Sequence, residues 1–129
     1  MLLDTSFLID LMNGDEAAVS KAQQLESDLV QQRISSMTLF ELYYGIARAI
    51  DSEEERETVE NVLESKPVQP ADTAVMRKAG RLSGELQNDG APVGDGDVII
   101  GATAAVVGEP VLTRNVDDFE RLGVDVEPY

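Results

Sequence analysis

Apolar residues recur at two different spacings along this chain, and the two spacings alternate. Stretches such as residues 15–32 carry apolar side chains three or four positions apart, as at Ala22 and Leu25, which is the period of an α-helix. Short apolar runs such as residues 111–113 separate these stretches and are typical of buried strands. The pattern predicts helices over residues 6–12, 15–32, 37–50, 52–63, 73–90, 98–107 and 116–122, and strands over residues 1–4, 33–35, 67–70, 111–113 and 124–126.

Short strands that alternate with helices predict an α/β fold, in which helices flank a central parallel sheet. The chain contains no repeat, no low-complexity tract and no internal linker, so we expect one domain over residues 1–129. Ligands in such folds bind beyond the carboxyl ends of the strands. Asp4 and Asn115 follow two of the expected strands, and these two strands should be neighbours in the sheet. A functional site is therefore expected around these positions.

The composition narrows the chemistry that such a site can perform. The chain has no cysteine and no histidine, which excludes disulfides, thiolate nucleophiles, imidazole metal ligands and the Ser-His-Asp triad. Any acid–base or metal chemistry must therefore rest on aspartate and glutamate. No apolar run approaches the length of a membrane span and no basic leader precedes one, so we expect a cytoplasmic protein without a membrane segment.

Three acids are candidates for the site, and each also has a purely structural interpretation. Asp4 can cap the helix that follows it, and Asp97 can cap the helix over residues 98–107. Glu41 can complete a capping box with Thr38. For any one of these acids taken alone, capping is the more common role.

Three features favour a shared site over three separate caps. Glu41 lies within an apolar helical stripe, where a charge is either solvated or directed into a cleft. Asp95 and Asp97 both precede a helix of small residues, although a cap needs only one carboxylate. The strand ends at Asp4 and Asn115 should also be adjacent. These features predict a cluster of carboxylates.

Four segments of the chain carry a resemblance to a known family. They are LLDTSF over residues 2–7, MTLFELYYG over residues 37–45, DVIIGATAA over residues 97–105 and LTRNVDDF over residues 112–119. In their order and spacing these segments resemble the PIN domain family, and in particular the VapC toxins of type II toxin–antitoxin pairs. The resemblance implies a Rossmann-like PIN domain with a metal-dependent endoribonuclease site.

The resemblance also implies a role for each acid. Asp4 matches the first acid of the family, Glu41 the second and Asp97 the third. Asp4 and Asp97 are thereby implied as ligands of Mg²⁺, for which Mn²⁺ can substitute, while Glu41 either ligates the metal or orients the attacking water. Magnesium prefers hard oxygen ligands, and a metal-bound water can hydrolyse a phosphodiester without histidine.

Asn115 departs from the family pattern. The family often has a fourth acid at this position, directly after the Thr-Arg pair, whereas an amide supplies no charge. Either Asp117 or Asp118 compensates through a water, or the site holds one metal ion instead of two. The departure also keeps an alternative open, in which the chain is a catalytically inert PIN-like module that binds RNA or protein.

The expected partners follow from the resemblance as well. They are an RNA substrate (tRNA or rRNA), a VapB-type antitoxin and a second copy of the chain in a homodimer, and Tyr44 is a candidate for either protein interface. Arg77, Lys78 and Arg81 form the only basic cluster. They contact RNA or balance nearby acids such as Glu85, and we favour the second interpretation.

The net charge of −15, from 25 acidic and 10 basic residues, opposes both compaction and the binding of a polyanion. In molar salt the Debye length falls to about 3 Å, and this repulsion is largely screened. The chain also has few lysines, namely Lys21, Lys66 and Lys78. We therefore predict a halophilic source.

We predict that the protein loses stability when KCl or NaCl is removed, because unscreened repulsion among surface carboxylates then acts on the folded state. Thermal unfolding in dilute buffer and in molar KCl measures this loss. Full stability and activity in dilute buffer would contradict salt adaptation.

Overall fold

The central sheet is built from very short strands. A computed structural model describes residues 1–129. All strands run parallel in the order β3-β2-β1-β4-β5, with Leu3 of β1 aligned with Ile34 of β2 and Leu112 of β4. The strands are β1 Leu2–Leu3, β2 Arg33–Ser35, β3 Val68–Gln69, β4 Val111–Leu112 and β5 Val126–Glu127.

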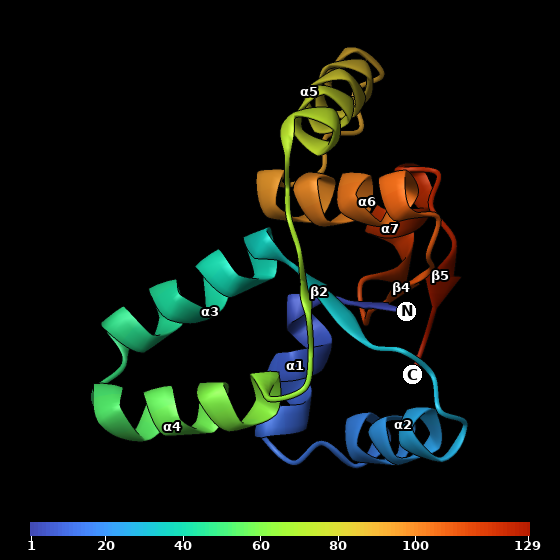
Figure 1. Ribbon diagram of the computed structural model, residues 1–129. Helices are drawn as coiled ribbons and strands as arrows, with labels where there is room; N and C mark the ends of the chain where they lie inside the picture. The colour runs from blue at the N-terminus through green and yellow to red at the C-terminus, as the bar shows by residue number, and fades with distance from the viewer.

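Helices cover both faces of this sheet (Figure 1). They are α1 Thr5–Met12, α2 Glu16–Ser27, α3 Ser36–Arg48, α4 Ser52–Leu63, α5 Thr73–Asn88, α6 Asp95–Val107 and α7 Val116–Arg121. One face carries α1 to α4, among which α3 and α4 run side by side as a hairpin, and the other carries α5 to α7 (Figure 1). The predicted α/β fold with a parallel sheet flanked by helices is confirmed. None of the helices has both the length and the apolar character that crossing a membrane requires.

The alternation of side chains along each strand divides the core into two parts. Successive residues of a strand point to opposite faces. Leu2 and Val111 pack with buried residues of α5, α6 and α7, whereas Leu3 and Leu112 pack with buried residues of α1 to α4. β1 and β4 therefore lie between two apolar layers, which explains why they are apolar at every position.

Helix α6 is longer at its start than the sequence predicted. It begins at Asp95, with Gly94 as its N-cap, and not at residue 98. Asp97 consequently lies inside the first turn and does not cap the helix, so the capping interpretation of Asp97 is wrong. The stretch predicted as a loop supplies this first turn, because Asp95 and Asp97 are favourable near the positive end of the helix dipole.

Other predicted boundaries also shift, two of them at the second helix and at the last strand. The second helix ends at Ser27 instead of residue 32, because Leu29 has a φ of 55°, in the left-handed region that stops a helix. The last strand occupies Val126–Glu127 instead of residues 124–126. Neither shift moves a candidate site residue.

The small residues of α6 allow close packing in the middle of the fold. A Cβ added at Gly101 would lie 2.6 Å from Cδ1 of Leu122, just after α7. This close approach holds α7, and the loop that precedes it, near the start of α6. The elements that carry Asp4, Asp97 and Asn115 are thereby packed into one region.

Candidate active site

The carboxylate of Asp4 is buried at the carboxyl end of β1, the middle strand, with only 1% of the residue exposed. Its Oδ1 accepts a hydrogen bond from the backbone N–H of Thr5 at 2.8 Å. Its Oδ2 accepts hydrogen bonds from the hydroxyls of Ser6 and Thr113, both at 2.7 Å. A buried charge is costly unless it is hydrogen-bonded, so these donors allow Asp4 to remain in the core. Asp4 thus caps α1, as the sequence predicted, and it is also part of the candidate site.

The capping box predicted for Glu41 does not form. Helix α3 begins at Ser36 with Ser35 as its N-cap, so Thr38 already lies in the first turn. The side chain of Glu41 turns instead toward α1, where its Oε1 accepts a hydrogen bond from Thr5 Oγ1 at 2.8 Å. The capping interpretation of Glu41 is therefore wrong, and its carboxylate belongs to the region around Asp4.

Glu41 also rests against the first turn of α6. A Cβ added at Gly96 would lie 2.8 Å from Oε2 of Glu41, so only a glycine allows this approach without displacing the carboxylate. Burial raises the pKa of Glu41, the hydrogen bond from Thr5 opposes this rise, and the charge of Asp4 adds to it. Residues from α1, α3 and α6 therefore share one electrostatic environment.

Asp97 is the most strongly perturbed acid of this group. Its pKa is raised from 3.8 to about 6, mainly by burial and in addition by the neighbouring charges of Asp4, Asp118 and Glu41. Like charges shift a pKa in this way only when they are close. The structure thus brings the three acids predicted from the sequence together at the carboxyl edge of the sheet.

The fourth predicted position, Asn115, lies at the rim of this group. It is exposed, its backbone N–H donates to Thr113 Oγ1 at 2.9 Å, and its side chain does not cap α7. Asp118, one turn into α7, is instead the fourth acid that acts on Asp97, while it also forms an ion pair with Arg121. Of the two acids considered as compensation for Asn115, the structure favours Asp118.

The residues present fit a divalent cation by their chemistry. They are hard oxygen donors crowded closely enough to repel one another, and a cation relieves that repulsion. No three of the acidic side chains converge on a single point. Magnesium is commonly held by only one or two carboxylates, with water and substrate phosphate completing its shell, so convergence of three is not required.

Several hydroxyl groups support the acids by hydrogen bonds that were not predicted from the sequence. Thr113 follows β4 and is fully buried, yet only the pairing of β4 with β1 brings its hydroxyl to Asp4. The Thr38 hydroxyl lies 3.1 Å from that of Thr5, the residue that holds Glu41. The only sign of this support in the sequence was that Thr5, Thr38 and Thr113 lie within the motif segments. The hydroxyl of Thr5 donates to Glu41 and that of Ser6 donates to Asp4.

A second network fixes Arg114 beside the acids. Arg114 Nη1 donates to both carboxylate oxygens of Asp10, at 2.7 and 2.9 Å, and the hydroxyl of Tyr129 donates to the same carboxylate at 2.6 Å. The Tyr129 ring packs edge-on against Phe7. Arg114 and Asp118 also line one surface hollow of about 320 Å³, so a cation is held at the border of the acidic group. No pattern along the chain predicts that residues so far apart would meet.

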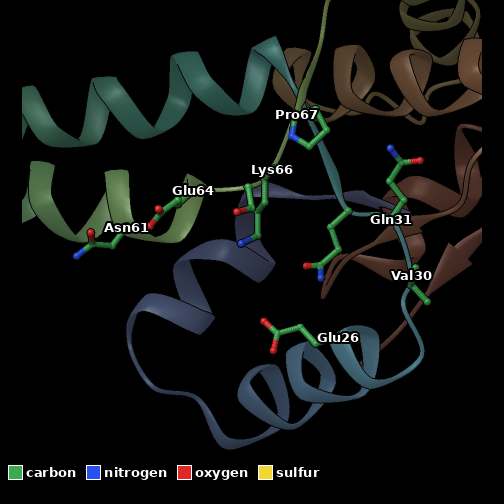
Figure 2. Close-up of a pocket in the computed structure, with 9 residues that line it drawn as sticks. Glu26, Val30, Gln31, Asn61, Glu64, Lys66 and Pro67 are labelled. Carbon is green, nitrogen blue, oxygen red and sulfur yellow. The ribbon is translucent and has the colours of Figure 1, made fainter.

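A different hollow lies at the opposite edge of the sheet (Figure 2). It measures about 490 Å³ and is lined by side chains of α2, α4 and the segments that precede β2 and β3, among them Glu26, Gln31, Asn61, Glu64, Lys66 and Pro67. The ammonium of Lys66 donates to the carbonyl of Val62 at 2.5 Å, and burial lowers the pKa of Lys66. None of the predicted site residues lies in this hollow, which is at the amino ends of the strands.

Comparison with known proteins agrees with this geometry. The PIN domain family matches residues 1–125. The chain is 35% identical to the tRNA(fMet)-specific endonuclease VapC of Salmonella typhimurium, over 99% of this chain and 96% of that protein. It superposes on DNA-bound VapBC from Salmonella typhimurium with a TM-score of 0.87 at 30% identity, covering 98% of this chain and 96% of that one.

A further crystal structure, VapBC2 from Rickettsia felis bound to a promoter DNA fragment, has a TM-score of 0.89 at 22% identity and covers 99% of this chain and 97% of that one, which supports the fold. The chain belongs to the PIN domain family and, within it, to the VapC proteins. The resemblance inferred from the four sequence segments is confirmed. Ribonucleases of the PIN domain family generally depend on a divalent metal ion.

We predict that Asp97→Asn stabilises the metal-free protein near neutral pH. In the folded state Asp97 keeps its proton up to about pH 6, whereas the unfolded chain releases it near pH 3.8. The folded state therefore binds more protons in this window, and its stability falls as the pH rises through the window and stays lower above it. The substitution removes this penalty.

The gain in the free energy of unfolding should be close to zero at pH 3.5 and about 1 kcal/mol at pH 7. The value at pH 7 is smaller than the full pKa shift implies, because solvent screens the charge of this half-buried side chain. Urea unfolding in EDTA at the two pH values measures it. Asp95→Asn, an exposed acid in the same turn, is the matched control. An equal gain in both variants, or a gain independent of pH, would contradict the crowding of carboxylates around Asp97.

Proposed function

We propose that this chain is a divalent-metal-dependent endoribonuclease of the VapC type, which acts as the toxin of a toxin–antitoxin pair. The observation that supports this function best is the group of Asp4, Glu41 and Asp97 at the carboxyl edge of a PIN-domain sheet. The names of its relatives, which include a tRNA(fMet)-specific endonuclease and several VapC ribonucleases, point the same way.

The proposed metal ligands are Asp4 and Asp97, with Mg²⁺ as the ion and Mn²⁺ as a substitute. A cation held there would stabilise the charge on the scissile phosphate and supply an activated water. Asp4 is suited to a fixed role because three hydrogen bonds orient it. Glu41 is held by Thr5 and can ligate the metal or orient the attacking water.

The proposed substrate is RNA, and tRNA is the first candidate because the relative that is 35% identical carries the name of a tRNA(fMet)-specific endonuclease. The side chain of Arg114 is held by Asp10, whose carboxylate also accepts a hydrogen bond from Tyr129, and it is 59% exposed. It can therefore receive a phosphate at the rim of the site without reorganising. A strand of RNA would then be anchored next to the bond that is cut.

The proposed protein partners are a VapB-type antitoxin and a second copy of the chain. Solved structures similar to this chain are described as VapBC complexes. Phe40 and Tyr44 are one turn apart on α3 and are 64% and 58% exposed, which is typical of residues that anchor a protein interface. The cytoplasmic location expected from the sequence is part of this proposal and stays a prediction.

The sharpest test compares two neighbouring acids. Asp97→Asn should lower Mg²⁺-dependent cleavage of a tRNA(fMet) transcript by about 100-fold or more, because it removes a proposed ligand while preserving shape. Asp95→Asn, two residues earlier in the same turn, should leave the rate within about threefold. Gel assays in KCl with Mg²⁺ or Mn²⁺ measure both rates, and circular dichroism confirms folding.

Retention of cleavage by Asp97→Asn would refute the assignment of this site. Failure of the unaltered protein to cut RNA or to gain thermal stability with Mg²⁺ would instead favour the inert PIN-like module, because a ligand that binds only the folded state must stabilise it.

We also predict that Asn115→Asp tightens Mg²⁺ binding. The substitution places a charge at the position where the family often has its fourth acid, at the rim of a hollow shared with Asp118. An added charge a few ångströms away is worth about 1 kcal/mol in water, which corresponds to about fivefold in Kd. The Mg²⁺ dependence of thermal stability measures the change, and Asn13→Asp, an exposed site at the end of α1, is the control. Equal changes in both variants would mean that net charge alone is responsible.

A further inference from the structure

The few basic residues of this chain divide into two groups. Five of the ten form ion pairs, namely Lys21, Arg33, Arg56, Arg114 and Arg121. Lys66 donates its ammonium to a backbone carbonyl. Arg48 lies over the ring of Tyr44. The remaining three are Arg77, Lys78 and Arg81, and none of them has an acidic partner. All three are on α5, the only helix with a net positive charge.

This finding contradicts the interpretation favoured from the sequence, in which the cluster balances nearby acids. If these residues balanced nearby acids, ion pairs with Glu85 or with acids of neighbouring helices would be expected, and none forms. In a chain of net charge −15, three cations left without acidic partners on one helix are available for an external anion.

The position of α5 relates this cluster to the candidate active site. Helix α5 packs across α6, the helix that carries Asp97 in its first turn (Figure 1). Gly80 and Ser83 of α5 line a hollow of about 280 Å³ together with Asp95 of α6. The middle of α5 therefore lies beside Asp95 at the start of α6, and Asp95 is two residues before Asp97 in the chain. A polymer bound at the acids can extend onto α5.

The outer face of α5 is shaped for a close approach. Arg77 and Arg81 are exposed and one helical turn apart, on the side of α5 away from the buried Val75 and Ala79. Gly84 lies on the same side and Gly80 at its margin nearer α6, and a Cβ added at either would meet nothing within 4 Å. A glycine inside a helix costs about 0.5–1 kcal/mol relative to alanine, and no contact within the molecule requires these two.

We propose that the strip formed by Arg77, Gly80, Arg81 and Gly84 binds the phosphate backbone of the RNA substrate outside the cleavage site. This inference rests on the proposed function. It identifies the surface where this acidic protein would bind its negatively charged substrate. The guanidinium groups would pair with successive phosphates, and the two glycines would let the backbone lie against the helix. A second copy of the chain fits less well, because two such strips facing one another would bring like charges together.

The experiment measures RNA binding as a function of salt. The double variant Arg77→Gln/Arg81→Gln is compared with Arg48→Gln/Arg56→Gln, which removes the same charge from the α3–α4 hairpin. Both are made in the full chain with Asp97→Asn, so that a labelled tRNA(fMet) transcript is bound without being cut. Each lost phosphate contact should lower the slope of log K against log[KCl] by about 0.7–0.9, so the α5 variant should lose about 1.5 and the control nothing. In the Asp97-intact protein the α5 variant should raise KM and leave kcat unchanged.

Three outcomes would overturn the proposal. The first is an unchanged slope and KM in the α5 variant while the unaltered protein still cuts RNA, which leaves the proposed function standing. The second is an equal loss in both double variants, which would assign the effect to net charge. The third is a change of oligomeric state in the α5 variant at constant RNA affinity, measured by light scattering, which would assign the strip to a second copy. Absence of any RNA binding by the Asp97→Asn parent and of any cleavage by the unaltered protein would refute both this proposal and the proposed function.

Discussion

The buried carboxylate of Asp4 is the constraint on which the rest of the site depends. A charge that is 1% exposed is tolerated only if its oxygens are hydrogen-bonded, and the donors come from the start of α1 and the end of β4. Satisfying Asp4 therefore fixes β1 against β4 and orients the first turn of α1. The same first turn of α1 carries Thr5, whose hydroxyl donates a hydrogen bond to Glu41. The same interactions that make the central strands compatible with a buried charge thus assemble the candidate active site.

Charge is distributed unevenly over the protein. The acids at the carboxyl edge are crowded enough to raise the pKa of Asp97 to about 6, so the metal-free fold carries an unfavourable electrostatic energy at this edge. Cations on the surrounding surface do not relieve it fully. Arg114 is occupied by Asp10, Arg121 pairs with Asp118 alone, and the basic residues of α5 point outward. The metal-free fold therefore keeps part of this unfavourable energy.

At Asn115 the chain departs from the family pattern, but another acid still acts on Asp97. An amide stands where the family often has an acid, yet the charge of Asp118, one turn into α7, reaches Asp97. The close packing of Gly101 against Leu122 holds α7 near α6 and makes this possible. Asp97 therefore has Asp4, Glu41 and Asp118 as acidic neighbours, although position 115 supplies no charge.

The sequence by itself determined the class of fold and the identity of the central acids. Alternating helical and strand periods predicted a parallel α/β sheet, and the absence of histidine and cysteine left carboxylates as the only groups for catalysis or metal binding. The fold prediction is confirmed because periodicity is a local property of the sequence, whereas the roles of the acids in catalysis and metal binding stay predictions. Helix ends were less predictable: α6 starts at Asp95 because the favourable interaction of acids with its amino end outweighs the loop-like composition of that segment.

Only the tertiary structure decided which role each acid takes and what supports it. Asp4, Glu41 and Asp97 each matched a helix cap, yet Asp4 alone is one, because Glu41 and Asp97 lie inside their helices and face other elements. The contacts of Thr113 with Asp4 and of Tyr129 with Asp10 join residues more than a hundred positions apart. Such contacts depend on strand order and on the packing of helices across the sheet. No spacing along the chain encodes them, so the sequence could name the acids but not the network that holds them.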